Sequence, residues 1–471
     1  MAARRRLTPW MIGVGGVTFL AGLLFGYDQG VISGALPLLQ KDLGLSTLES
    51  EIVTSWVTLG ALFGALVAGG TADRIGRRWT AVAAGVLFAI GALIEAVAPG
   101  AGMLTFGRVV TGLGVGFASV VAPLYAAEMA PKRLRGRFVS TYQLAITVGI
   151  FFAYLADDAL TGSDRWRLMF ALAVIPGAAL VVGFLVMPES ARWLLKMGRR
   201  EEARASLVKV DGPELADSEL ETIEADLEAE ALEGQASWSE VFSPGLRRAL
   251  WVGVGLATLQ QVTGINAIIY YANEIFAEAG FTTAEQQAKA TLYAVGAVNV
   301  LATFIAVAWV DRFGRRPLLF SGLIGMTVSL AAVGFSFAAL ENQPEGGPTS
   351  TTVGGLVTVL ALVVFIASFA FSLGPIVWTI ISEIYPNRVR GRAMAVATAV
   401  NWFAAFLVAQ FFLSLVDAIG ESTTFFMFSA LCIVTYAFVH RWVPETKGKS
   451  LEEIQERWVV KGDLMLEEEP A

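Results

Sequence analysis

Apolar stretches of about 20 residues or more recur along the whole chain, and they constrain its fold more than any other feature. Backbone polar groups in lipid must be satisfied within the spanning segment, which favours helices. The composition agrees: 55% of residues are hydrophobic and 16% are charged, against about a quarter charged in soluble proteins. We therefore predict an all-α membrane protein with twelve transmembrane helices at 10–38, 52–71, 79–98, 102–126, 138–157, 167–187, 249–277, 290–309, 317–339, 353–382, 392–418 and 421–442.

Basic residues gather in alternate loops, which sets the expected orientation. Lys and Arg are enriched on the cytoplasmic side of membrane proteins. The chain starts with a basic cluster, and such clusters return after the second, fourth, eighth and tenth apolar stretches, whereas the intervening loops hold little beyond Lys41, Arg165, Arg167 and Lys289. This pattern predicts a multi-pass protein of the cell (inner) membrane with both termini cytoplasmic.

Residues 188–248 are polar and acidic, so we expect them to lie outside the bilayer. Their Glu, Ala and Leu content favours helix over the alternative of a disordered linker. The predicted organisation is an N-terminal six-helix bundle (1–187), a cytoplasmic helical linker domain (188–248), a C-terminal six-helix bundle (249–443) and a cytoplasmic tail (444–471).

Three charged motifs occur twice, once in each half. DRIGRR at 73–78 returns as DRFGRR at 311–316, EMAPKRLRGR at 128–137 returns as EIYPNRVRGR at 383–392, and PESARWLL at 188–195 returns more weakly as PETKGKSL at 444–451. Each copy follows the matching helix of its half. Parallel repeats of whole bundles, related about the membrane normal, are a transporter architecture with the substrate bound near the midplane.

This ordered set of motifs resembles the sugar porter family of the major facilitator superfamily, over the chain from Gly22 to about Lys449. That family includes bacterial sugar–proton symporters and facilitative glucose transporters. The resemblance implies two pseudo-symmetric six-helix bundles and alternating access to a neutral monosaccharide, hexose or pentose. It also implies a monomer in the lipid bilayer, with sugar and proton as its small-molecule partners.

The composition gives no support to catalysis or metal binding. The single His440 excludes a histidine-rich metal site, and the single Cys432 excludes an intramolecular disulfide. Gly112, Gly114 and Gly116 lie within an apolar stretch, where small residues permit close helix packing rather than nucleotide binding. We predict no enzyme activity, no cofactor, no metal and no nucleic-acid partner.

The charged motifs favour a salt-bridge network at the cytoplasmic ends of the helices. Arg side chains bind carboxylates through two parallel hydrogen bonds. Arg clusters that merely hold the loops inside are the alternative. By resemblance, a latch that stabilises the outward-facing state is formed by Asp73, Arg77, Glu128, Arg135, Arg137, Glu189, Arg192, Asp311, Arg315, Glu383, Arg390 and Arg392.

Polar residues inside apolar stretches are candidates for function. The richest stretch is LQQVTGINAIIYY at 259–271. Gln261 and Asn266 are five positions apart, about 140° around a regular helix, so we expect Gln260, Asn266 and Tyr270 to lie nearer one face. Gly264 could loosen this helix, and Pro375 breaks the helix that carries Trp378.

Amides donate and accept hydrogen bonds, and therefore match sugar hydroxyls, although hydrogen bonds between helices are the alternative for each one. By resemblance, the sugar ligands are Gln143, Gln260, Gln261, Asn266, Asn299, Trp378 and Asn401. The cavity is lined or gated by Phe25, Tyr270, Tyr271 and Trp402.

Asp28 is the only charge in the first apolar run, and a mid-membrane charge costs at least about 2.5–3.5 kcal/mol. Arg108 is the candidate partner, and protonation of Asp28 would break the pair. Bacterial sugar–proton symporters carry Asp at this GYD position and facilitative animal transporters carry Asn, so the resemblance favours symport. A uniporter with a static ion pair and a non-transporting sugar sensor are the alternatives.

Three other acids receive no role from the sequence. Asp157 and Asp158 are interpreted as solvated loop charges near the outer end of the fifth span. Glu95, in the third span, is expected to reach the outer interface.

Overall fold

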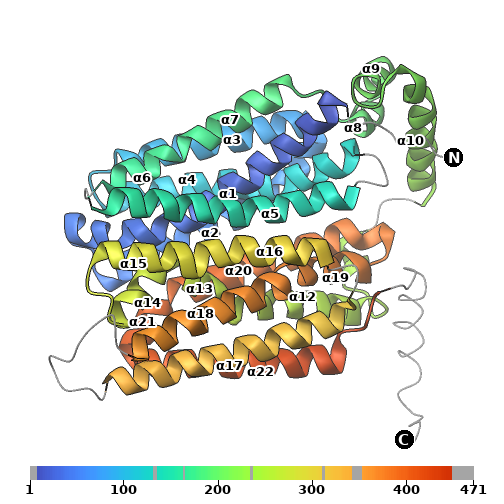
Figure 1. Cartoon of the computed structure of the whole chain (residues 1–471). Coiled ribbons are helices and arrows are strands. Elements are labelled where there is room, and N and C mark those ends of the chain that lie inside the picture. The colour runs from blue at the N-terminus through green and yellow to red at the C-terminus, as the bar shows by residue number, and fades with distance from the viewer. Residues whose placement is uncertain are drawn as a thin grey trace, which may run out of the picture. The chain divides into compact units, whose positions relative to one another are not determined.

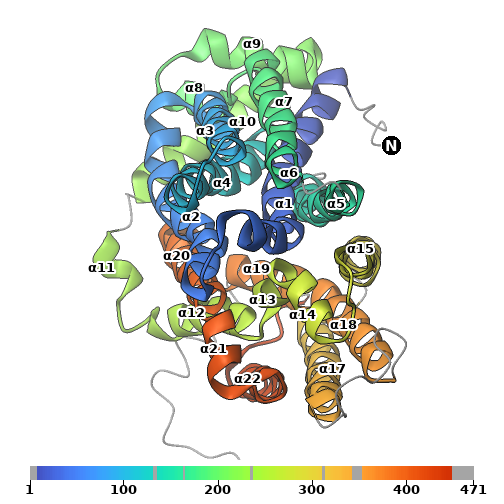
Figure 2. The ribbon, with the colours of Figure 1, turned by 90° about the vertical axis from the view of Figure 1, so that its left-hand side faces the viewer.

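The computed structural model describes residues 8–130, 135–162, 165–233, 237–309, 313–341 and 353–447. In these residues the regular structure is helical (Figures 1 and 2). Among these described residues, twelve helical segments are long and apolar enough to cross a membrane, which confirms the predicted number. They are Pro9–Leu43, Thr47–Ile75, Arg77–Ala96, Ala101–Met129, Thr141–Thr161, Trp166–Val186, Arg247–Tyr270, Ala284–Ala306, Arg315–Leu340, Val353–Ile384, Arg388–Gln410 and Glu421–Trp442.

The chain forms two compact units, Met1–Leu232 and Glu233–Ala471. The long helices of unit 1 are α1 (Pro9–Leu43), α2 (Thr47–Ile75), α3 (Arg77–Ala96), α4 (Ala101–Met129), α5 (Arg135–Thr161), α6 (Trp166–Leu172) and α7 (Val174–Val186). Helix α1 packs along α5, and α4 packs along both α2 and α3.

Glycines permit these close contacts, as the sequence predicts for α4. A Cβ atom added to Gly114 would lie 2.7 Å from the carbonyl oxygen of Ala84 on α3. Added to Gly112 or Gly116, it would overlap the backbone of α2 at Val57 or Ala61. Real Cβ atoms do not approach backbone so closely, so larger side chains here would force the helices apart.

Three polar helices complete unit 1 and gather at one end of its long helices (Figure 1). They are α8 (Ala191–Lys196), α9 (Arg200–Asp211) and α10 (Pro213–Glu233). Their small core is formed by Ala191, Trp193, Leu194, Ala203, Leu207, Ala216 and Leu220. The hydroxyl of Thr8, at the start of α1, donates a hydrogen bond to the carbonyl of Val210 (2.8 Å) and ties these helices to the bundle.

Unit 2 has more interrupted helices. It contains α11 (Trp238–Val241), α12 (Arg247–Val262), α13 (Ile265–Tyr270), α14 (Ala272–Glu278), α15 (Ala284–Ala290), the π-helix η1 (Thr291–Ala297), α16 (Val298–Trp309), α17 (Arg315–Glu341), α18 (Val353–Phe371), α19 (Leu373–Ile384), α20 (Asn387–Gln410), α21 (Phe412–Ile419) and α22 (Glu421–Trp442). Helix α17 packs against α18 and α22, and α12 packs against α20.

Two interruptions fall where the sequence predicts them. Gly264 has φ +91°, a left-handed conformation that favours glycine, and it separates α12 from α13. Ser372 separates α18 from α19, three residues before Pro375. Proline has no N–H to donate, and its ring clashes with the carbonyl four residues earlier, here that of Phe371.

Candidate functional site

A buried ion pair joins α1 to α4 in unit 1. The Arg108 Nη1 atom lies 2.6 Å from Asp28 Oδ1, and the two residues are 0% and 3% exposed. Arg108 also donates from Nε to the carbonyl of Val53 on α2 (3.0 Å). The two residues that the sequence paired are therefore in direct contact, and the pair compensates the charge of Asp28.

Glu95 is also part of this site, which corrects the sequence expectation. It is 1% exposed and does not reach the outer interface. Its Oε2 atom lies 3.9 Å from Arg108 Nη1, and its Oε1 atom accepts a hydrogen bond from Thr111 Oγ1 (2.6 Å). The short connection between α3 and α4 turns the chain back, so that Glu95 faces Arg108 although they are distant in sequence. The available signal was a pair of opposite charges, one on each side of the turn between two predicted helices.

The interpretation of Asp157 as a solvated loop charge was also wrong. Helix α5 continues to Thr161, so Asp157 and Asp158 both lie within it. Asp157 is buried, and its Oδ2 atom accepts a hydrogen bond from the backbone N–H of Gly34 on α1 (3.1 Å). Asp158 is half-buried. The close packing of α1 on α5, which the sequence pattern does not reveal, removes Asp157 from solvent.

In unit 2, four predicted sugar ligands form one cluster of buried amides, called here the amide cluster: Gln260, Gln261, Asn266 and Asn401. Gln261 Nε2 donates to Asn401 Oδ1 (3.2 Å), and Asn401 Nδ2 donates to Gln260 Oε1 (2.9 Å). Asn266 Nδ2 donates to Gln261 Oε1 (2.8 Å).

Backbone carbonyls fix the edges of the amide cluster. Gln260 Nε2 donates to the carbonyl of Leu373 (2.8 Å), beside the break between α18 and α19. Asn401 Nδ2 donates to the carbonyl of Ala257 (2.9 Å). The cluster therefore links α12, α13, α19 and α20, and any rearrangement of its amides acts on all four helices.

The contact between Gln261 and Asn266 contradicts the expected separation of about 140° around one helix. That estimate assumed a regular helix through the whole stretch. The chain instead leaves the helix at Thr263 and Gly264 and starts a new one at Ile265, which rotates Asn266 towards Gln261.

The other predicted cavity residues lie in several places. In unit 2, Asn299 is buried near the start of α16, directly after η1, whereas Trp378 on α19 is partly exposed. Gln143 on α5 and Phe25 on α1 are partly exposed and belong to unit 1. The aromatic residues of unit 2, Tyr270, Tyr271 and Trp402, are buried. Tyr271 donates from its hydroxyl to the carbonyl of Ala409 (2.8 Å) and stacks on Phe412 (5.0 Å between ring centroids).

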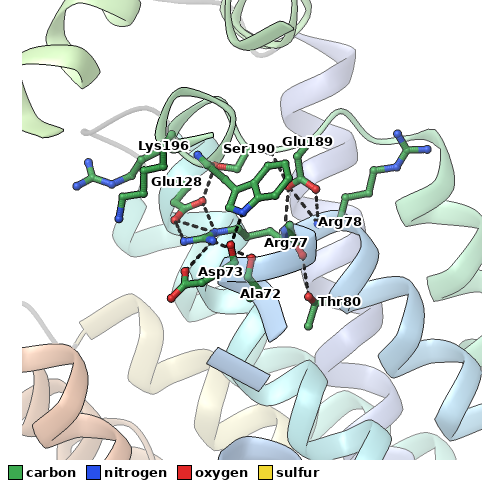
Figure 3. A network of polar contacts seen from close by, with 12 residues as sticks. Ala72, Asp73, Arg77, Arg78, Thr80, Glu128, Glu189, Ser190 and Lys196 are labelled. Atoms are coloured by element: carbon green, nitrogen blue, oxygen red, sulfur yellow. Dashed lines mark hydrogen bonds and ion pairs between the residues drawn. The ribbon is translucent and has the colours of Figure 1, made fainter. Parts of the chain in front are cut away.

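Arg77 is the centre of the charged network in unit 1 (Figure 3). Its Nε atom donates to both oxygens of Glu128 (3.1 and 3.0 Å), and its Nη2 atom donates to Glu128 Oε1 (2.9 Å). Its Nη1 atom donates to Asp73 Oδ1 (3.0 Å). Ser190 donates its hydroxyl to Glu128 as well. This part of the predicted latch thus joins the ends of α2, α3 and α4.

Glu189 accepts hydrogen bonds from backbone N–H groups at a helix terminus rather than from a guanidinium. Its Oε1 atom accepts the backbone N–H groups of Arg77 (3.0 Å) and Arg78 (3.2 Å) at the start of α3. A carboxylate is favourable at this positive helix end. Burial nevertheless raises the pKa of Glu189, although the backbone donors act in the opposite direction.

Unit 2 repeats both features. Arg315 Nη2 lies 3.2 Å from Glu383 Oε1. Glu445 accepts the backbone N–H groups of Arg315 and Arg316 (both 3.0 Å) at the start of α17, as Glu189 does for α3. Desolvation raises the pKa of Glu445, but hydrogen bonds from the backbone around Lys447, Arg316 and Arg315 outweigh it and hold the pKa below its usual value. The predicted latch does not include Glu445, although Glu445 stands in the 444–451 repeat at the position that Glu189 has in 188–195.

The remaining residues of the predicted latch have different contacts. Arg192 pairs with Glu230 of α10. Arg390 donates to the carbonyl of Tyr385 (3.2 and 3.1 Å), and Arg392 lies over the ring of Trp238 (5.3 Å). Asp311 and the side chains of Arg135 and Arg137 lie outside the described residues.

Comparison with known proteins then identifies the family. The family model described as "Sugar (and other) transporter" matches residues 14–458. The chain belongs to the sugar porter family of the major facilitator superfamily. This transporter is 38% identical to the galactose-proton symporter of Escherichia coli strain K12, covering 95% of the chain and 94% of that relative. It is 38% identical to the glucose transport protein of Synechocystis, covering 94% and 96%.

The solved structures agree with the family. A partially occluded inward-open structure of the xylose transporter XylE from E. coli matches with a TM-score of 0.80 and 30% identity, covering 94% of the transporter and 100% of that chain. XylE is also known in complex with 6-bromo-6-deoxy-D-glucose, and that structure matches with a TM-score of 0.76 and 30% identity, covering 95% and 99%. The protein is therefore a multi-pass inner-membrane transporter with the major facilitator fold, and not an enzyme.

Proposed function

We propose that the protein is a proton-coupled symporter of a monosaccharide, hexose or pentose, that works by alternating access. The buried pair of Asp28 and Arg108 carries the proposal, because it is a titratable group with its own counter-charge inside a membrane bundle. Relatives named as galactose-proton and arabinose-proton symporters support the coupling to protons.

The proton step follows from the pair. When Asp28 is ionised, its carboxylate holds the guanidinium of Arg108 and keeps α1, α4 and, through Val53, α2 together. When Asp28 takes up a proton, the neutral carboxyl group attracts Arg108 much less. Proton binding would thereby change the contact between these helices and let the loaded carrier change its conformation.

The amide cluster supplies the sugar chemistry. A sugar hydroxyl both donates and accepts, so it can replace amide–amide hydrogen bonds one for one and leave no buried polar group unsatisfied. We assign sugar binding to Gln143, Gln260, Gln261, Asn266, Asn299, Trp378 and Asn401, with Phe25, Tyr270, Tyr271 and Trp402 lining or gating the cavity. Because the assigned polar groups are neutral, the cluster suits a neutral substrate.

The charged ends of the helices would regulate the conformational change. Arg77 with Glu128, and Arg315 with Glu383, hold the cytoplasmic ends of helices within each half. Release of these pairs would accompany opening to the inside. The expected orientation, with both termini cytoplasmic, places this latch on the inner face.

The test is uptake of radiolabelled sugar into proteoliposomes, with and without an inward proton gradient, for the wild type and Asp28→Asn. We expect gradient-driven accumulation in the wild type, and only exchange or equilibration in Asp28→Asn. Asp42→Asn is the matched control, because Asp42 is an exposed acid on the same helix that pairs with Arg167. Equal, non-accumulating uptake by the wild type and Asp28→Asn would instead indicate a uniporter, and sugar binding without uptake would indicate a sensor.

A further inference from the structure

Arg108 faces two carboxylates, and the proposed function uses only one of them. The same Nη1 atom lies 2.6 Å from Asp28 Oδ1 on α1 and 3.9 Å from Glu95 Oε2 on α3. The second distance exceeds an ordinary charge-assisted hydrogen bond by about 1 Å. A small movement of the guanidinium would therefore exchange one acid for the other.

The packing of α3 on α4 holds Glu95 in this position. The Cγ atom of Glu95 occupies the space above Gly107, where an added Cβ would lie only 2.7 Å away. The hydroxyl of Thr111 fills the corresponding space above Gly91 and donates to Glu95 Oε1 (2.6 Å). Each helix thus supplies a glycine at the point where the other presents a polar side chain, so that Glu95 is directed at Arg108.

The charges of the site explain why a second acid is useful. With both carboxylates ionised, one buried cation faces two anions. Protonation of Asp28 alone would leave a buried guanidinium without a counter-ion, and an uncompensated buried charge is strongly unfavourable. If Glu95 is present, the same protonation leaves one cation and one anion, so the buried charges balance.

We propose that Glu95 is the second counter-ion of Arg108 and a positioning residue for the proton step. As the proton from outside forms an O–H bond on Asp28, the guanidinium moves from Asp28 to Glu95, which stays ionised. The inference rests on the proposed role of Asp28 as the proton carrier. It adds that Glu95 favours proton uptake and gives Arg108 a defined second position.

Other titratable groups lie on the helices that surround this site. Asp42 of α1 pairs with Arg167 of α6, which also donates to the carbonyl of Ala98 just beyond α3 (3.3 Å). Asp157 of α5 accepts the N–H of Gly34. Glu51 is a further buried acid, on α2, and α7 carries no titratable residue.

The experiment compares Glu95→Gln with the wild type in proteoliposomes at a series of external pH values. We expect the pH of half-maximal proton-driven accumulation to fall by at least about one unit, since Asp28 then loses the anion that favours its protonation. Counterflow of sugar, which needs no net proton movement, should stay within about twofold of the wild type. Asp157→Asn removes another buried acid of the same half and should leave the pH profile unchanged.

Stability of the double variant gives a readout independent of transport. Asp28→Asn leaves Arg108 with Glu95, and Glu95→Gln leaves it with Asp28, whereas the combined variant removes both counter-ions. The fall in Tm of Asp28→Asn/Glu95→Gln should exceed the sum of the two single falls. Thr111→Val removes only the hydroxyl that donates to Glu95, so it should shift the pH profile in the same direction by a smaller amount. This variant replaces Glu95→Gln in the transport assay if Glu95→Gln does not fold.

Two results would separate the inference from the function on which it depends. If Asp28→Asn abolishes accumulation while Glu95→Gln or Thr111→Val keeps the wild-type pH profile, the role of Glu95 is wrong and symport through Asp28 stands. If Asp28→Asn accumulates sugar as the wild type does, the proposed function fails first.

Discussion

The two halves contain the same charged motif at corresponding ends of their helices, but the motif is more deeply buried in unit 1 than in unit 2. This difference predicts unequal effects of equivalent substitutions. In unit 1 the side chains of Arg77 and Glu128 are 4% and 7% exposed. In unit 2 those of Arg315 and Glu383 are 14% and 28% exposed. We compare Glu128→Gln with Glu383→Gln, which keep side-chain size and remove one negative charge each.

The magnitudes follow from the contacts. Removal of one partner from a buried pair costs about 3–5 kcal/mol, because the other charge stays behind. Arg77 keeps Asp73 at 3.0 Å, so we expect the lower end, about 3 kcal/mol, for Glu128→Gln. Arg315 makes one 3.2 Å contact with Glu383 in a more exposed setting, where a pair contributes about 1 kcal/mol or less.

The assay is thermal unfolding of both purified variants in the same detergent. At about 2–4 °C per kcal/mol for a half of this size, Glu128→Gln should lower Tm by roughly 6–12 °C and Glu383→Gln by at most about 4 °C. We also expect Glu383→Gln to slow net transport and to increase accessibility from the inner side, because it loosens the latch. Equal losses of Tm would refute the argument from burial, and unchanged turnover with unchanged accessibility would refute the latch.

Two further predictions concern unit 2. Asn401→Ala should weaken sugar binding by about 10–100-fold in an equilibrium binding assay, because Gln260, Gln261 and the Ala257 carbonyl each lose a buried hydrogen-bond partner. The control is Asn273→Ala. Asn273 is a buried amide outside the amide cluster that accepts a hydrogen bond from Thr291, so this variant should leave the sugar affinity unchanged and lower only Tm. Because the pKa of Glu445 is held below its usual value, the ionised carboxylate stabilises the fold above about pH 4.5, and this stabilisation is lost as the pH falls through the lowered pKa. As a helix cap it should contribute about 0.5–2 kcal/mol, so the Tm difference between the wild type and Glu445→Gln should be complete near neutral pH and disappear on acidification. A Tm difference that persists in acid would contradict the role of Glu445 as a cap.

Much of the fold could be predicted from the sequence because lipid imposes a simple rule. A membrane span needs length and apolarity, and both can be read directly from the sequence, so the predicted number of helices was correct. The predicted contact between Asp28 and Arg108 was also correct. A charge inside a span has to be compensated, and few cations lie at a suitable depth. The same rule applied to Glu95 would have linked it to Arg108, since both lie near one end of the α3–α4 hairpin.

What the sequence did not reveal depends on local departures from regular helix and on helix packing. The contact between Gln261 and Asn266 exists only because Gly264 interrupts the helix, and periodicity assumes that no interruption occurs. Asp157 was predicted to be exposed because the position of a residue near the end of a span does not determine whether it is buried. Its burial depends on the close packing of α1, whose Gly34 N–H donates to it. Glu445 was missed because the residues around it differ from those around Glu189, although the two carboxylates accept the same kind of backbone hydrogen bonds.

The repeat also separates what the two halves share from what they do not. Both halves cap the same helix with a carboxylate, through Glu189 in unit 1 and Glu445 in unit 2, so the architecture of the helix ends is common to them. Within its long helices unit 1 buries charged residues, including Asp28, Glu95 and Arg108, whereas unit 2 buries the neutral amide cluster. A carboxylate binds a proton and an amide binds a hydroxyl, so this division favours a carrier whose proton step depends on unit 1 and whose sugar-binding amides lie mostly in unit 2. Substitutions at Asp28 or Glu95 should accordingly change the pH dependence of transport with little effect on sugar affinity in exchange, whereas those in the amide cluster should do the reverse.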